Sequence, residues 1–147
     1  MSLVTDKVFY NALRSNESLM AQVGGRIEST SIPVPDEEFL NEPVPYVIIT
    51  FDGMTNTGHT KDNSYEGDTD QVTVSIEVAA ESRDHLGQLM QAIRQTVVDY
   101  FEDTDGHDWD DYEYIPVNYT LTASAVAYDS MKPCYYQTLS YQCDTNP

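Results

Sequence analysis

Residues 71–101 read QVTVSIEVAAESRDHLGQLMQAIRQTVVDYF and contain the two clearest periodic patterns in the chain. In residues 71–80 the apolar side chains fall on every second position, which is typical of a β-strand with one face in a core. After Ser82, a residue suited to capping a helix, the apolar residues follow 3.6-residue spacing. They are Leu86, Leu89, Met90, Ile93, Val97 and Phe101. The stretch predicts a strand followed by a long helix that lies on the sheet.

Two short helices and two strands are predicted upstream of this stretch. Val8, Phe9, Ala12 and Leu13 share one helical face. Thr5 or Asp6 is expected to cap this first helix, and Asn16 begins a second short one. The pair Gly24–Gly25 ends the second helix, because glycine accepts the left-handed backbone found after helices. A first strand is expected to begin at Arg26–Ile27. Residues 46–51, YVIITF, are apolar at both odd and even positions, as is typical of a central strand.

Polar segments separate these elements. The segment between Pro33 and Pro45 contains further prolines and four acids, so it is expected to be a surface loop. Residues 52–70 are polar and contain three glycines, which predicts a long connection between paired strands. Near the end of the chain, residues 119–128 and 134–143 predict a closing hairpin with a turn at 129–133.

The order of these elements predicts an α+β fold in a single domain of residues 1–147. We expect a mainly antiparallel sheet of four to five strands, with the long helix packed on one face and the short helices at the amino-terminal end. Cys134 and Cys143 are nine positions apart in one predicted strand, which places them on opposite faces and disfavours a disulfide.

The charge of the chain excludes several classes of partner. It has 25 acidic residues against seven Lys and Arg, and a formal net charge of −18. Nucleic-acid affinity comes mainly from Lys and Arg, so specific nucleic-acid binding is not expected, and the same argument applies to anionic membranes. No apolar run approaches the roughly 20 residues of a spanning helix, and the first residues lack the features of a signal peptide. A cytoplasmic site of synthesis is therefore expected.

The sequence offers no catalytic constellation. It contains none of the phosphate-binding, dinucleotide-binding or zinc motifs, and none of its three histidines pairs with a convincing nucleophile. His59 lies in a polar segment, His85 in the first turn of the long helix and His107 in an acidic run. We therefore predict that the protein is not an enzyme and needs no cofactor.

An acidic run between Asp99 and Glu113 holds eight acids in fifteen residues. Asp103, Asp105 and Asp108 are weak candidates for binding a divalent cation, because carboxylates around a glycine bend suit hard cations. With Gly106 at the sixth position of an EF-hand loop, however, Phe101 and Tyr112 occupy the first and twelfth positions, where ligands belong. The alternative is a run facing solvent, a partner or a lumen. Its members are Asp103, Asp105, Asp108, Asp110 and Asp111.

The amino-terminal half resembles a known family in the order of its motifs. A helix with Phe9 and Leu13 precedes a second with Leu19, then Val-Gly-Gly-Arg-Ile at 23–27, a proline-rich gap and Pro-Tyr-Val-Ile at 45–48. This order is similar to that of the tail-completion proteins of long-tailed bacteriophages and prophages, also called tail terminator or head–tail joining proteins.

The resemblance implies an α+β structural subunit without catalytic residues. Such a subunit forms a ring, expected to be a hexamer, that caps the tail tube and joins it to the head. Its partners would be further copies of itself, the tail tube and the head-connector proteins. It would assemble in the cytoplasm of the host bacterium and remain in the tail of the virion. If DNA passes through the ring, an acidic lumen formed by Asp103 to Asp111 would let it slide. The alternatives are another phage neck or connector component, and a divalent-cation-binding module unrelated to phage.

Overall fold

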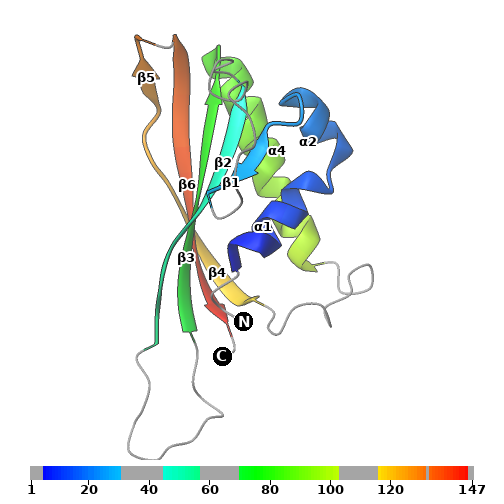
Figure 1. Ribbon diagram of the computed structural model, residues 1–147, viewed down its shortest axis with the longest axis vertical. Helices are drawn as coiled ribbons and strands as arrows, with labels where there is room; N and C mark the ends of the chain where they lie inside the picture. Colours follow the sequence, from blue (N-terminus) through cyan, green and yellow to red (C-terminus); the bar gives the residue numbers. More distant parts are fainter. Residues whose placement is uncertain (1–4, 31–44, 57–69, 103–115, 132, 146–147) are drawn as a thin grey trace, which may run out of the picture.

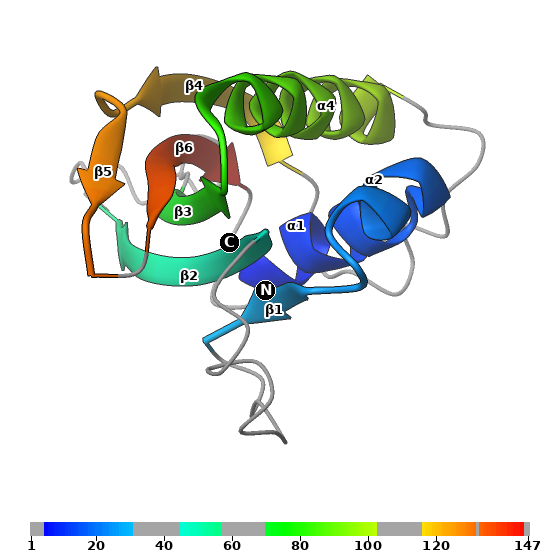
Figure 2. The same ribbon diagram turned by 90° about the horizontal axis from the view of Figure 1, so that it is seen from above.

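The alternating strand and the long helix after it form as the sequence predicts. The computed structural model describes residues 5–30, 45–56, 70–102, 116–131 and 133–145. Its elements are α1 (Thr5–Arg14), α2 (Glu17–Gln22), β1 (Ile27–Ser29), β2 (Tyr46–Thr55), β3 (Asp70–Ala80), α4 (Arg83–Glu102), β4 (Pro116–Ala123), β5 (Ala127–Asp129) and β6 (Cys134–Thr145). The helices lie together on one face of a twisted sheet (Figures 1 and 2).

The sheet confirms the predicted α+β class. Its strand order is β1-β2-β3-β6-β4, and β5 also pairs with β6. Within the described residues β1 and β2 form the one parallel pair, and the other pairs are antiparallel. The described residues form six strands where four to five were expected, because the strand predicted over residues 119–128 is divided into β4 and β5.

A β-bulge causes this division. Ala123 lies opposite Leu139 and Ala127 opposite Tyr136, so four steps along one strand match three along the other. The Ser124 amide donates to the Thr138 carbonyl oxygen at 2.9 Å, and the Ser124 hydroxyl oxygen accepts from the Thr138 amide at 3.0 Å. A side-chain oxygen thus takes the place of a backbone acceptor, and the alternation of faces reverses beyond it.

The connection predicted over residues 52–70 is too long, because β2 continues past a second bulge and β3 begins at Asp70. Strand β2 continues to Thr55, with Asp52 as the additional residue between Phe51, opposite Val74, and Gly53, opposite Thr73. Gly53 has a φ of 151°, a conformation that favours glycine. The Asn56 side-chain amide donates to Asp70 at 2.6 Å across the two strands. Residues 57–69 lie outside the described part of the chain.

The predicted helix boundaries are largely confirmed. The Asn16 side chain accepts from the Leu19 amide at 3.1 Å, and the Ser82 hydroxyl accepts from the His85 amide at 3.1 Å. Gly24 and Gly25, with φ of 61° and 77°, follow α2. The expected cap by Thr5 or Asp6 is wrong in position, since α1 already includes both residues. Asp6 instead accepts a buried hydrogen bond from the Ser29 hydroxyl at 3.3 Å, which ties α1 to β1.

One hydrophobic core lies between the helices and the sheet. Fully buried contributors from helices and strands include Phe9, Leu13, Leu19, Val47, Ile49, Val74, Ile76, Leu89, Ile93, Leu139 and Tyr141. Cys134 and Cys143 are both buried, and neither is part of a disulfide. Cys143 belongs to the core, where burial raises the pKa of its thiol to about 12. No helix among the described residues is long and apolar enough to cross a membrane.

Candidate functional site

The acidic candidates identified in the sequence fall outside the described residues. This holds for the run that contains Asp103, Asp105, Asp108, Asp110 and Asp111, and for most of the acidic loop between Pro33 and Pro45. Whether the run binds a cation or faces a lumen therefore stays a prediction. Within residues 5–30, 45–56, 70–102, 116–131 and 133–145, no three His, Cys, Asp or Glu side chains group as metal ligands would.

His85 is the histidine that the structure describes. Its Nδ1 lies 2.7 Å from Glu81 Oε1 near the start of α4. A backbone hydrogen bond at Glu81 itself and, to a lesser extent, His85 lower the pKa of the Glu81 carboxyl. This pair lies at the surface and joins the first turn of α4 to the residues before the helix, so we assign it a local structural role.

The helix-free face of the sheet is mostly polar. The residues that point to it alternate with the core residues and are mostly half-buried or exposed. They include Tyr46, Thr50, Thr73, Ser75, Glu77, Tyr136, Thr138, Ser140, Thr120 and Thr122.

Several side chains of this face bond to one another. The Tyr46 hydroxyl donates to Glu77 at 3.0 Å, and the Ser75 hydroxyl makes a short bond to Asp52. Burial, followed by the charge of Glu77, raises the pKa of Tyr46. Hydrogen bonds within the sheet thus satisfy part of this face already.

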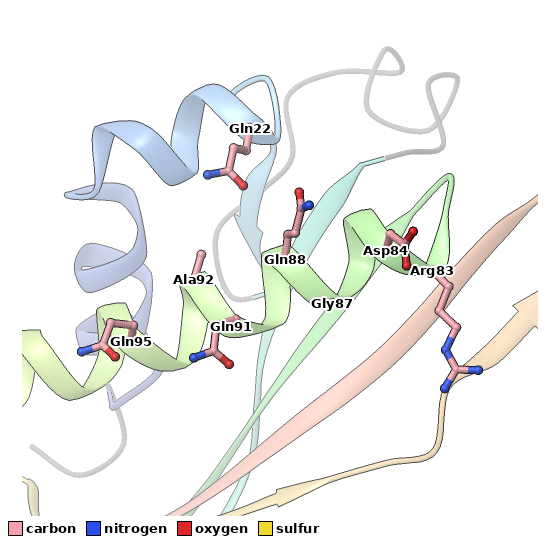
Figure 3. Close-up of a pocket in the computed structure, with 8 residues that line it drawn as sticks. All are labelled: Gln22, Arg83, Asp84, Gly87, Gln88, Gln91, Ala92 and Gln95. Carbon is pink, nitrogen blue, oxygen red and sulfur yellow. The ribbon is translucent and has the colours of Figure 1, made fainter.

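The outer face of α4 forms an open groove of about 950 Å³ with the end of α2 (Figure 3). Four glutamines contribute to it, three from α4 and Gln22 from α2, together with one base and one acid. The lining residues are Gln22, Arg83, Asp84, Gly87, Gln88, Gln91, Ala92 and Gln95. This surface is close to neutral in a chain whose net charge is −18.

A smaller pocket of about 220 Å³ lies where the second half of α4 passes β4. Helix α4 contributes two glutamines, an arginine and a valine, β4 contributes Tyr119 and Leu121, and β6 contributes Tyr141. The lining residues from the helix are Gln91, Arg94, Gln95 and Val98.

Tyr141 forms the buried wall of this pocket. It is 1% exposed, and its ring centroid lies 5.0 Å from that of Phe9 and 5.4 Å from that of Tyr119. Burial raises the pKa of Tyr141, and the charge of Arg94 acts in the opposite direction. The hydroxyl is therefore within electrostatic range of the guanidinium.

The sequence alone did not identify this pocket. Arg94 is a polar position of an amphipathic helix, and Tyr119 and Tyr141 are positions of two predicted strands. No short-range spacing connects them, because the residues come together only when α4 packs beside β4 and β6. Pairing of the predicted strands would have placed Tyr119 near Tyr141, but the position of the helix across them is a tertiary feature.

Comparison with known proteins identifies relatives of the chain. The family model described as "Tail completion protein gp17" matches residues 7–114. A chain of the solved structure entitled "Virion of native gene transfer agent (GTA) particle" has a similar fold, with a TM-score of 0.63 at 12% sequence identity. The similarity covers 97% of this chain and 94% of that one. No curated protein sequence matches.

Proposed function

We propose a ring-forming role for this chain, because it belongs to the tail completion protein gp17 family and is a structural protein of a phage tail. In this proposal, copies of the chain close into a ring, expected to be a hexamer, on the end of the tail tube. The ring ends growth of the tube and presents the surface to which the head joins. No catalytic step is part of this role.

The observation that carries the proposal is the family match from Lys7 to Tyr114. It includes both short helices, β1, β2, β3 and α4, so it covers the greater part of the helix layer and half of the sheet. The similar fold of a chain in a gene transfer agent virion is consistent with a role in a particle. We propose that the protein assembles in the host cytoplasm and remains in the virion tail.

The distribution of charge supports assembly through the α4 side. Copies of a chain with a net charge of −18 repel one another, so stable contacts require surfaces with few acids. The residues that line the pocket beside β4 include one base, Arg94, and no acid. This pocket is thus suited to contact between copies. The lumen-facing orientation of Asp103 to Asp111 remains part of the proposal.

Native mass measurement over a range of concentrations tests the ring. We expect a closed oligomer of one size, either free or after addition of tail tubes. Complementation of a lysate that lacks its tail completion protein then tests joining to the head. Binding to purified connectors without binding to tube ends would favour the alternative of a neck component and contradict the proposed position.

A further inference from the structure

The pocket between α4, β4 and β6 combines a buried tyrosine with an arginine that makes no ion pair among the described residues. Its volume of about 220 Å³ is several times the roughly 30 Å³ that a water molecule occupies in the liquid. It can hold the head group of one side chain. Gln91 and Arg94 of α4 line one side of the pocket, and Tyr141 of β6 lines the other.

The Tyr141 hydroxyl makes no hydrogen bond within the part of the chain that the structure describes. Its ring packs against Phe9 and Tyr119, but ring contacts do not satisfy the O–H donor. Buried polar groups in folded proteins nearly always have a partner, in the protein or in ordered water. Tyr141 is 1% exposed and lines the pocket, so an acceptor that enters the pocket could serve as the partner of this hydroxyl.

Arg94 is exposed and makes no ion pair with another described residue. Arg14, by contrast, donates to the Gly25 and Ile27 carbonyl oxygens and lies 5.2 Å from the centroid of the Tyr10 ring. The nearby carboxylate of Asp99 accepts a hydrogen bond from Gln95 at 2.8 Å. The guanidinium of Arg94 thus remains available to an incoming anion, and its planar fork matches a carboxylate.

We propose that this pocket receives an aspartate or glutamate side chain from a second copy of the chain. The proposal rests on the proposed ring and names one of its contacts. Acids outnumber bases 25 to seven, so a carboxylate is the anion that a neighbouring copy presents most readily. In a head-to-tail ring, a pocket on one copy meets a different surface of the next.

The outer edge of β4, beside the pocket, is accessible to a second copy of the chain. Among the described strands β4 pairs with β6 alone, so its outer edge beside the pocket is open. An open edge presents unpaired backbone groups that a neighbouring copy can meet. The incoming carboxylate would accept from Arg94 and from the Tyr141 hydroxyl together.

The first test compares Arg94→Glu with Arg83→Glu by native mass and by ring formation on tail tubes. Both variants make the same charge change on the same helix, but Arg83 lies outside the pocket. We expect Arg94→Glu to weaken association roughly 10- to 100-fold, as loss of a charge-assisted hydrogen-bonded pair does. Arg83→Glu should have a much smaller effect. Equal effects of the two, or normal association of Arg94→Glu, would overturn the proposal.

The second test identifies the incoming group. In Arg94→Lys, a carbodiimide should form an amide between the introduced lysine and an acid of another copy, and mass spectrometry would locate it. A crosslink within the same copy, or none in the assembled ring, contradicts the inference. Stabilisation of the wild type by millimolar acetate or phosphate, without any change in ring formation by Arg94→Glu, would instead indicate a site for free anions. If the wild type forms no ring in solution or on tubes, the proposed function itself fails.

Discussion

Replacement of Tyr141 by phenylalanine separates the pocket's role in folding from its role in assembly. The change removes the hydroxyl and keeps the ring, with its contacts at 5.0 Å to Phe9 and 5.4 Å to Tyr119. A buried hydroxyl without a partner costs stability, so its removal should leave the free energy of unfolding unchanged or raise it by about 1 kcal/mol. For a domain of this size, 1 kcal/mol corresponds to a rise in Tm of roughly 2–4 °C.

The matched control is Tyr46→Phe. The Tyr46 hydroxyl donates to Glu77 at 3.0 Å, so its removal should lower the free energy of unfolding by about 1 kcal/mol. Thermal and urea unfolding of the free subunit measure both variants. The expected pattern is opposite in sign: Tyr141→Phe is neutral or stabilising in the free subunit, and Tyr46→Phe is destabilising.

Tyr141→Phe should impair assembly even though it does not destabilise the free subunit. If a carboxylate of a second copy accepts from this hydroxyl, the variant should form rings less readily although its subunit is at least as stable. Destabilisation of the free subunit by more than 1 kcal/mol would refute the reasoning, because it would show that the hydroxyl already has a partner within the fold.

Two further predictions concern the core and its caps. Asn16→Ala should lower the free energy of unfolding by about 1 to 2 kcal/mol in urea titrations, because it removes the hydrogen bond that caps α2 at the Leu19 amide and the 2.8 Å bond to Thr96. Asn16→Asp keeps the capping oxygen. If Asn16→Asp lowers the free energy of unfolding as much as Asn16→Ala does, the cap does not contribute. The Cys143 thiol, with its pKa raised from 9.0 to about 12, should resist alkylation in the native state at pH 8 to 9 and react on unfolding. The thiol ionises at lower pH in the unfolded chain than in the folded one. The stability that burial of the neutral Cys143 thiol contributes is therefore complete below about pH 9 and is lost as the pH rises towards 12. Rapid alkylation of the native protein at pH 8 would contradict the buried position.

Local patterns were sufficient to predict most of the fold. The alternation over 71–80, the helical spacing after Ser82 and the caps at Asn16 and Gly24–Gly25 each act over a few residues, and the structure confirms them. The bulges at Asp52 and Ser124 were not predicted. A bulge adds one residue to a strand without lowering its β-propensity, so the sequence around it gives little sign of the changed register.

The candidate site was much less accessible from the sequence. The most conspicuous feature, the acidic run from Asp103 to Asp111, lies outside the described residues and keeps its status as a prediction. The pocket depends on three elements and on a hydroxyl that lacks a partner, which is a property of packing. The sequence does show the excess of acids, and that excess explains why an arginine that makes no ion pair with another described residue, Arg94, matters.

The central claim is that copies of the chain form a ring that ends the tail tube. Electron microscopy of tubes assembled with and without the purified chain tests it most directly. Tubes assembled with the chain should stop growing and carry a ring of density, expected to be six-fold, at one end. Tubes that grow equally long in both samples, with no added density at either end, would contradict it.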